Sequence, residues 1–314
     1  MKKISIFAAL IGCAMLVVSC DDKNKNGNGN ENEATDPSTI ASDALIAYFP
    51  FDGNGNDSKG GLTPSNTATT SATFAGGQRG QCYQGSPEAT SGLLYPLPET
   101  SPLKTLTQFA FSMWVKLAPN TTETTHDPEQ MIFQLDGKGD WVWGNLFLLQ
   151  HRNFPQNDPS ERNRDNAEMD CYFWKESAAA WKGQRANGWW LDVTQPQWRH
   201  IICTYNAATS EFHGYLNGVE FTSPDTTVYT GVNRWQGPED DAAAHIPFGN
   251  LEFNDAQNLV IGAWAERLKG TAITEDVWAA PMRGLIDEFR IYNRSLTATE
   301  AKALYDAELS QAEK

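Results

Sequence analysis

The amino-acid sequence predicts an all-β domain that ends in one short helix. Apolar residues recur at every second position of residues 109–116, and an Asn-Gly pair at 217–218 joins two strand-like runs. The first pattern is typical of a strand with one buried face, and the second is a strong signal of an antiparallel hairpin. The one clear helix signal begins at Thr297. The segment from Ala44 to the end is about 270 residues long, which suits a β-sandwich with inserted loops.

The strand predictions follow the chain. In residues 109–116, large apolar side chains alternate with other residues and give the strand one strongly apolar face. Residues 198–205, W-R-H-I-I-C-T-Y, predict a buried strand. Residues 207–210 are small and polar and predict a turn, so the strands around them form an antiparallel meander. The predicted strands are 109–116, 198–205, 212–216, 219–222, 258–262 and 284–292.

The C-terminal helix is predicted from its first residues. Thr297 is followed three positions later by Glu300, which is the spacing of a capping box. The helix then carries an apolar side, made of Ala301, Leu304, Tyr305 and Leu309. We therefore expect a short helix that docks on the β domain.

The first 20 residues predict a bacterial lipoprotein. Lys2 and Lys3 precede an apolar run over 4–18, which is short for a membrane span but has the length of a signal peptide. The run ends in L-V-V-S-C, which resembles the lipobox in which a cysteine is acylated and becomes residue one. The resemblance implies lipidation at Cys20. The alternative is an ordinary secretory signal with a chance cysteine.

Three segments are predicted: a signal peptide over 1–19, a flexible linker over 20–42 and one domain over 43–314. The linker is rich in Asn, Gly, Asp and Glu and cannot bury enough apolar surface to fold. Its Asp21-Asp22 pair resembles the export signal of surface lipoproteins in Bacteroidetes. We expect an outer-membrane lipoprotein exposed at the cell surface, although a periplasmic orientation stays open.

The charge of the chain restricts its partners. Without residues 1–19 it holds 22 basic and 39 acidic residues, a net charge of about −17. Nucleic-acid binding needs a basic surface and is excluded on this ground. The membrane is a partner through the lipid anchor only. An uncharged ligand fits the charge better than an acidic polysaccharide, although local arginines can override this preference.

The cysteines do not predict a disulfide framework. After removal of the signal, with Cys20 lipidated, three remain: Cys82, Cys171 and Cys203. An odd number argues against a set of bridges. Cys171 and Cys203 fall in strand-like runs, where they either pair or pack as small apolar groups.

Six segments occur in an order that resembles a known family. They are L-I-A-Y-F-P-F-D-G-N-G-N-D at 45–57, F-A-F-S-M-W-V-K at 109–116, W-R-H-I-I-C-T-Y at 198–205, G-Y-L-N-G at 214–218, L-V-I-G at 259–262 and G-L-I-D-E-F-R-I-Y-N-R-S-L at 284–296. The chain resembles the laminin-G-like, concanavalin-A-like family of bacterial surface proteins. This resemblance implies two packed antiparallel sheets in a jelly roll, extracellular binding of carbohydrate and often a calcium ion.

The chain departs from the family pattern by long polar, tryptophan-bearing insertions at 151–168, 175–197 and 223–257. Aromatic rings stack on the apolar faces of sugars while nearby polar groups bind hydroxyls, so these insertions predict a ligand site. Core packing is the alternative, and Trp189 and Trp190 point to opposite faces if they share a strand. The candidate ligand-binding residues are Trp143, Trp181, Trp189, Trp190, Trp235, Trp264, His151 and Arg152.

A structural calcium site is the second candidate. Residues 51–57 offer hard oxygens and glycines, although Asp, Asn and Gly also favour turns for local reasons. In related sandwiches, an acidic residue near the first strand and the Asp beginning the last strand hold an ion together. The resemblance therefore implies Asp52 and Asp287 as metal ligands.

Catalysis is the third candidate and the weakest. Glycoside hydrolases of this fold carry Glu, then Asp, then a further Glu on one face of a strand, so that two carboxylates flank the bond. Glu168 and Asp170 begin this pattern, but the next carboxylate is Glu176 and does not match the spacing. The sequence thus predicts a non-enzymatic, surface-tethered module that binds carbohydrate. The alternatives are a protein-binding adhesion or structural lipoprotein and, third, a glycoside hydrolase.

Overall fold

A computed structural model describes the part of the chain that carries the predicted domain. The described residues are 35–66, 70–88, 90–118, 129–138, 144–151, 166–178, 182–193, 195–221, 235–236, 246–269 and 279–312. The predicted signal peptide, Cys20 and the linker up to residue 34 lie outside them. In this part of the chain, no helix is long and apolar enough to cross a membrane.

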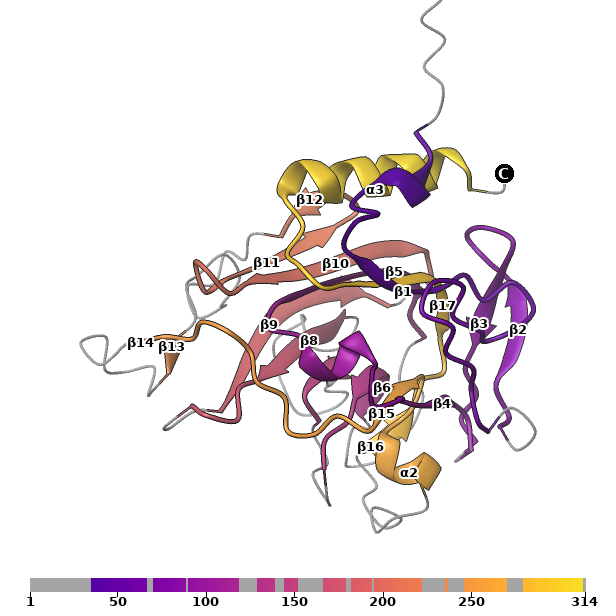
Figure 1. The fold of residues 1–314 in the computed structure, drawn as a ribbon. Coiled ribbons are helices and arrows are strands. Elements are labelled where there is room, and N and C mark those ends of the chain that lie inside the picture. Colours follow the sequence, from indigo (N-terminus) through magenta and orange to yellow (C-terminus); the bar gives the residue numbers. More distant parts are fainter. Residues whose placement is uncertain are drawn as a thin grey trace, which may run out of the picture. The chain divides into compact units, whose positions relative to one another are not determined.

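Two sheets pack face to face, and a helix lies across the outside of one of them (Figure 1). The first sheet has the order β12-β11-β10-β5-β17-β3-β2, with β1 also paired to β17. Its strands are β1 (Leu45–Phe49), β2 (Thr73–Gly76), β3 (Gln81–Gln84), β5 (Phe109–Lys116), β10 (Arg199–Asn206), β11 (Glu211–Leu216), β12 (Val219–Glu220) and β17 (Leu285–Tyr292).

The second sheet has the order β4-β15-β6-β7-β8-β9. Its strands are β4 (Leu93–Pro96), β6 (Glu129–Leu135), β7 (Leu146–His151), β8 (Asn166–Trp174), β9 (Gly183–Asp192), β15 (Asn258–Ile261) and β16 (Ala279–Pro281). The short β16 runs parallel to β6, whereas the other strand pairs are antiparallel. A separate two-stranded pair joins β13 (Trp235–Gln236) and β14 (Ile246–Pro247).

The fold confirms the predicted all-β, two-sheet jelly-roll sandwich with a short C-terminal helix. Strand β5 matches its predicted bounds, and the Asn-Gly pair turns with positive φ at Asn217 (51°) and Gly218 (74°). The apolar faces of the two sheets meet in one large core cluster, with Phe111 against Phe133 at 4.8 Å between ring centroids. Short helices at η1 (Pro37–Thr39), η2 (Pro102–Thr105) and α2 (Ala265–Lys269) complete the connections.

Helix α3 (Ala298–Ser310) begins with the predicted capping box, in which Thr297 and Glu300 satisfy each other's backbone N–H groups. Its apolar residues Ala301 and Leu304 pack on the outer face of the first sheet. Beneath the helix, the buried Glu308 carboxylate accepts hydrogen bonds from Trp114 and Arg290. The helix is therefore fixed by both apolar contact and a buried charge network.

Residues 36–42 differ from the prediction that the linker continues to residue 42. Ala41 is buried together with Ala44 in the cluster formed by α3 and the first sheet, and Ile40 packs against it. Asp36 caps the short η1 turn by accepting a hydrogen bond from the Ser38 backbone. The folded unit thus begins before residue 43, because Ile40, Ala41 and Ala44 pack in the cluster between helix α3 and the first sheet.

Strand β9 is the main difference inside the domain, since the sequence prediction placed 175–197 in an inserted loop. Its residues read G-Q-R-A-N-G-W-W-L-D, which shows no regular alternation. The strand forms because it pairs along its length with β8, from Trp174 opposite Gly183 to Asn166 opposite Asp192. The pairing extends the second sheet and creates the surface described next.

Candidate functional site

Alternate residues of β8 divide between the core and the outer face of the second sheet. Ala167, Met169, Cys171 and Phe173 belong to the core cluster between the sheets. Successive side chains of a strand point to opposite faces, so the residues between them lie on the outer face. We call this surface the β8 face; its described residues are Phe147, Glu168, Asp170, Tyr172, Trp174 and Arg185.

An aromatic strip crosses the β8 face. The rings of Phe147 and Tyr172 stack with centroids 4.7 Å apart and an angle of 12° between planes, and Trp174 continues the strip at 6.4 Å from Tyr172. Tyr172 is partly exposed, whereas Phe147 and Trp174 are buried. The strip therefore offers one accessible ring supported from both sides.

Gly183 lets the Tyr172 side chain lie across the neighbouring strand. A Cβ atom at Gly183 would lie 1.7 Å from the Tyr172 hydroxyl oxygen, which is far inside van der Waals contact. Any other residue would displace the ring. The glycine in β9 is thus required by the close approach of an aromatic side chain to its backbone.

An ion pair stands beside the aromatic strip. Arg185 is opposite Tyr172 in the β8–β9 register and donates hydrogen bonds from Nε (3.0 Å) and one terminal nitrogen (2.5 Å) to Oδ2 of Asp170. The Asp170 side chain is 3% exposed and that of Arg185 is 48% exposed. Burial lowers the pKa of Arg185, but Asp170, Glu168 and Glu129 outweigh it and raise the value.

A second polar pair closes the end of the strip. Glu176 accepts hydrogen bonds from Trp174 Nε1 (2.9 Å) and from Lys182 Nζ (2.7 Å), and these donors lower its pKa. The Lys182 ammonium also lies 5.9 Å from the centre of the Trp174 ring. Trp174 is therefore fixed at its ring edge by the hydrogen bond to Glu176 and at its ring face by Lys182.

The structure places the two catalytic-pattern residues Glu168 and Asp170 together on the β8 face, as their alternation predicts. Asp170, however, is engaged by Arg185, and Glu176 lies beyond the end of β8 in contact with Trp174 and Lys182. The described geometry thus gives Asp170 and Glu176 ion-pair and hydrogen-bonding roles.

Two predicted ligand residues share a register position on this sheet. β7 and β8 pair His151 with Glu168, and β8 and β9 pair Glu168 with Trp190. Trp189 is paired with Met169, a core residue. Trp235 is in β13, away from this register. Trp143, Trp181 and Arg152 lie outside the described residues.

Trp264 is a correction to the predicted ligand set. Its side chain is fully buried, packs with Met131, Phe147 and Leu149, and donates a hydrogen bond from Nε1 to the Glu129 carbonyl (3.0 Å). A ring without an exposed face cannot stack on a sugar. Trp264 instead supports the β8 face from below, because it packs in the same cluster as Phe147 and Tyr172.

The predicted metal residues Asp52 and Asp287 meet at one hairpin. Asp52 accepts a hydrogen bond from the Gln81 backbone (2.8 Å), and Asp287 accepts one from the Arg79 backbone (2.9 Å), so both carboxylates contact the β2–β3 turn. Burial raises the pKa of Asp287 to about 8. Its Oδ1 atom is buried and has no hydrogen-bond partner in the described part of the chain.

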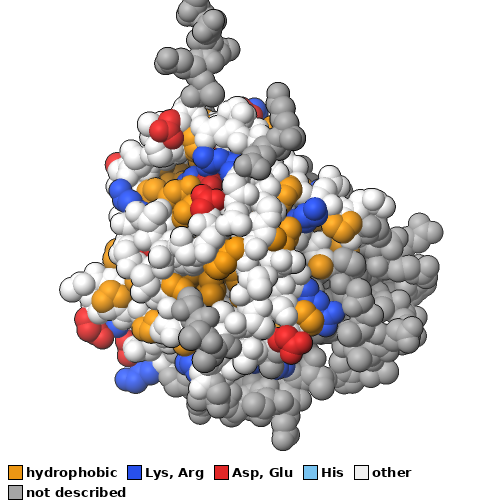
Figure 2. Space-filling model, turned by 90° about the vertical axis from the view of Figure 1, so that its right-hand side faces the viewer, with side chains coloured by type: hydrophobic (Ala, Val, Ile, Leu, Met, Phe, Trp, Pro, Cys, Tyr) orange, Lys and Arg blue, Asp and Glu red, His pale blue; other side chains and the backbone are white. Residues whose placement is uncertain are grey.

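The backbone around Asp287 is irregular. The pairing of β17 with β5 shifts between Asp287 and Arg290, and Glu288 has a φ of 54°. Such bulges re-aim side chains. Figure 2 views the side of the domain on which β2 and β3 lie, where acidic and basic side chains stand between small groups of hydrophobic ones. Within the described residues, no cluster of three or more His, Cys, Asp or Glu side chains suits a metal ion.

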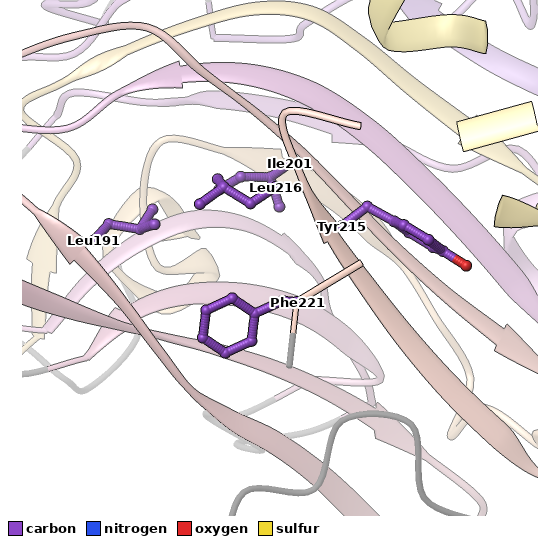
Figure 3. Close-up of a pocket in the computed structure, with 5 residues that line it drawn as sticks. All are labelled: Leu191, Ile201, Tyr215, Leu216 and Phe221. Carbon is purple, nitrogen blue, oxygen red and sulfur yellow. The ribbon is translucent and has the colours of Figure 1, made fainter. Parts of the chain in front are cut away.

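A small apolar pocket opens elsewhere, between the edges of the two sheets (Figure 3). The Tyr215 hydroxyl points away from the other four side chains in this view. A sugar needs polar partners that converge on it, and this lining offers apolar groups. The pocket is lined by Leu191, Ile201, Tyr215, Leu216 and Phe221.

The three described cysteines are free thiols buried in the protein. Cys171 on β8 and Cys203 on β10 both belong to the core cluster between the sheets. Of the two possibilities raised by the sequence, the structure shows packing.

Sequence reasoning missed Tyr172, Phe147 and the role of Arg185. The signal was present in β8, where Glu168, Asp170, Tyr172 and Trp174 alternate with apolar residues. The partners of Tyr172, however, come from β7 and β9 and become visible only when these strands are paired.

No protein-family model matches the sequence, and no curated protein matches it. Among solved structures, the binding domain of Botulinum neurotoxin DC in complex with rat synaptotagmin II is 11% identical, with 86% of this chain and 52% of that chain covered at a TM-score of 0.50. Domain 4 of the arabinanase AbnA from Geobacillus stearothermophilus, in complex with arabinotriose, is 21% identical, with 83% and 98% covered at a TM-score of 0.46.

The binding domain of Paraclostridial Mosquitocidal Protein 1 is 12% identical, with 84% of this chain and 52% of that chain covered at a TM-score of 0.49. The chain thus spans about half the length of the toxin binding domains and nearly all of the arabinanase domain. At this level of identity, the comparison with a TM-score of 0.50 shows a likeness of fold alone.

Proposed function

We propose that this chain is a non-enzymatic carbohydrate-binding module and that the β8 face holds the sugar. The observation that carries the proposal is the partly exposed Tyr172 ring, stacked on Phe147 and laid across Gly183 next to the half-exposed Arg185. A flat ring offers contact area at low conformational cost, and an adjacent guanidinium donates to hydroxyls in a fixed direction.

Support for the ring is what distinguishes this surface from an isolated surface tyrosine. Phe147, Trp174 and the buried Trp264 prevent Tyr172 from turning away, so little freedom is lost when a ligand stacks. His151 and Trp190 flank Glu168 in the strand register and extend the proposed site across three strands.

The proposal is tested by applying the purified full-length chain to an array of glycans and measuring the affinity of each hit by calorimetry. Tyr172→Ala is expected to weaken binding about tenfold or more, a loss of roughly 1.4 kcal/mol. Tyr172→Phe keeps the ring and is expected to retain most of the affinity. Tyr305→Ala on helix α3 applies the same truncation on the other sheet and is expected to leave binding unchanged.

Absence of any bound glycan, or equal binding by Tyr172→Ala and the wild type, would refute this site. An adhesion protein that recognises another protein is then the next hypothesis. The predicted residues Trp143, Trp181, Trp189, Trp190, Trp235, His151 and Arg152 enter the same series as single alanine variants.

We further propose that Asp52 and Asp287 hold a structural calcium ion against the β2–β3 turn. The buried, unpartnered Oδ1 of Asp287 supports this proposal, because a buried carboxylate oxygen is otherwise costly. Calcium takes six to eight oxygens, so carbonyls of the turn would have to complete the set. When bound, the ion would pin the ends of β1, β3 and β17 together.

Melting with calcium and with a chelator tests this second proposal. A ligand that binds the native state raises stability, so calcium is expected to raise the midpoint of the wild type but not that of Asp287→Asn. An identical melting temperature of the wild type with calcium and with chelator would refute a structural calcium ion.

Surface attachment through a lipid on Cys20 remains a proposal that rests on the sequence. The measurement is the mass of the N-terminal peptide from bacterial membranes, together with protease digestion of intact cells. We expect acylated Cys20 and cleavage of the exposed domain. A Cys20→Ser variant that stays in the membrane fraction would contradict the anchor.

A further inference from the structure

Arg79 contacts the Asp52–Asp287 pair through its turn and helix α3 through its side chain. We infer that a cation held by this pair tightens helix α3 against the first sheet, and that the Arg79 side chain transmits the effect. The inference rests on the proposed calcium site and gives that site a regulatory role in addition to its structural one.

The backbone of the β2–β3 turn lies directly against the two carboxylates. The Arg79 N–H donates a hydrogen bond to Oδ2 of Asp287 at 2.9 Å, and the N–H of Gln81, at the start of β3, donates one to Oδ1 of Asp52 at 2.8 Å. A Cβ atom at Gly77 would lie 2.5 Å from Oδ2 of Asp287, so this close approach needs a glycine. A change at the two carboxylates therefore acts on the backbone of Arg79.

The side chain of Arg79 reaches from the turn to helix α3. One terminal nitrogen donates to Oε2 of Glu288 at 2.5 Å, and the other donates to Oε1 of Gln311, the C-cap of the helix, at 2.6 Å. The Arg79 side chain is 23% exposed and that of Glu288 is 3% exposed, so salt screens this ion pair less than an exposed one. One guanidinium thus joins the turn, the last strand and the end of the helix.

Glu288 extends this connection to the buried side of the helix. The same Oε2 atom accepts hydrogen bonds from Arg290 and from the Tyr48 hydroxyl, both at 2.7 Å. Arg290 also donates to the fully buried Glu308 of α3, and its guanidinium lies 4.1 Å from the centre of the Tyr48 ring. The network therefore contacts the helix at two residues, Gln311 and Glu308. Contiguous hydrogen-bonded networks of this kind can carry coupling between two sites.

The direction of the effect follows from the conformational entropy of the turn. Ordering a turn and a long side chain costs entropy, and Arg79 must lose both kinds of freedom to bind Glu288 and Gln311. Coordination of a cation by Asp52, Asp287 and carbonyls of the turn would order the backbone in advance. The two binding events then favour each other. By thermodynamic linkage, loss of the contact with the helix must weaken cation binding by the same factor.

Hydrogen–deuterium exchange of the full-length chain, with calcium and with a chelator, tests the inference. The amides of α3 report local opening of the helix. We expect saturating calcium to slow their exchange about fivefold in the wild type, at the lower end of common allosteric effects. Calorimetric titration with calcium chloride measures the affinity of the same samples.

Arg79→Ala removes the side-chain link and keeps the backbone N–H that contacts Asp287. This variant is expected to bind calcium about fivefold more weakly, and saturating calcium is expected to leave the exchange of α3 unchanged. Lys302→Ala is the matched control, because it removes an exposed basic side chain from the same helix. It is expected to respond to calcium as the wild type does.

If Arg79→Ala melts at a much lower temperature, Gln311→Ala provides the test at an exposed position. This variant keeps the ion pair between Arg79 and Glu288, so calcium is expected to slow the exchange of α3 by only about twofold.

The possible failures of the inference and of the calcium site are distinguishable. Calcium binding without slower exchange of α3 in the wild type overturns the inference and leaves the calcium site standing. Wild-type protection of α3 by calcium in a folded Arg79→Ala variant, or in Gln311→Ala where that variant decides, overturns it as well. If the wild type binds no calcium in the titration, the proposed calcium site is refuted, and the inference is refuted with it.

The same measurements also check reciprocity. Calcium affinity that is equal in the wild type and Arg79→Ala would show that the side chain transmits nothing to the site, whatever the exchange of the helix.

Discussion

Replacing Glu308 by alanine tests whether the buried charge network fixes helix α3. The Glu308 side chain is fully buried, accepts hydrogen bonds from Trp114 Nε1 (2.8 Å) and from Arg290, and lies 3.2 Å from His200 Nε2. Its loss leaves the buried indole donor without an acceptor, which costs about 1–3 kcal/mol.

The same variant removes one of two carboxylates from Arg290. The other carboxylate, Glu288, remains 2.7 Å from the Arg290 guanidinium, which therefore keeps one of its two ion pairs. Loss of the charged hydrogen bond to Glu308 costs about 1.5–3 kcal/mol of folding stability. His200 keeps Ser112 at 2.8 Å. The expected total is about 3–5 kcal/mol, the range found when one partner of a buried ion pair is removed.

Urea unfolding followed by tryptophan fluorescence measures this loss, and Asp306→Ala is the control. Asp306 pairs with Lys302 on the exposed side of the same helix, where such a pair contributes less than about 0.5 kcal/mol. A Glu308→Ala loss below about 1 kcal/mol would refute the reasoning, because it would mean that the helix holds without its buried acceptor.

The pH dependence of the same comparison has a definite sign. Burial raises the pKa of Glu308, but Arg290, His200 and Trp114 outweigh it, so the value in the folded protein lies below the ordinary 4.5. A depressed carboxyl pKa gives stability that is present above the unfolded value and lost as the pH falls through the folded value. The difference between wild type and Glu308→Ala should therefore shrink below about pH 4.5.

Three further predictions concern the β8 face and the core. Gly183→Ala is expected to displace Tyr172 and to reduce glycan binding as strongly as Tyr172→Ala, and normal affinity in calorimetry would contradict the close approach seen here. Trp264→Ala is expected to cost about 3–5 kcal/mol in urea unfolding, whereas an unaffected midpoint would show that the residue is not part of the core. Burial raises the pKa of Cys82 to about 11 and also raises that of Cys203, so peptide mapping after thiol labelling at pH 8 should find both unmodified until the protein is denatured.

The parts of the fold that follow from local pattern could be predicted from the sequence. Alternation over 109–116, the Asn217-Gly218 turn and the Thr297–Glu300 capping box each depend on residues close in the chain, and each is confirmed. Strand β9 was missed because its composition has no strand pattern of its own, and the ladder with β8 supplies the stabilisation.

The candidate site was only partly predictable for the same reason. The inserted region was recognised as a source of ligand contacts, but the ring that the structure supports is Tyr172, whose placement depends on Gly183 in another strand. Trp264 was wrongly included among the ligand-binding residues. A tryptophan that follows a strand has the same local sequence pattern whether it is exposed or covered by a hydrophobic cluster, as Trp264 is.

The pairing of the first strand with the last has a consequence for how the protein reaches its folded state. Leu45 lies opposite Tyr292, and β17 stands between β5 and β3 as well as beside β1. The first sheet therefore cannot close until nearly the whole chain has been synthesised. Contacts between residues so distant in sequence make folding slow. A chain emerging from the ribosome thus completes its first sheet only after its last strand, β17, has been synthesised.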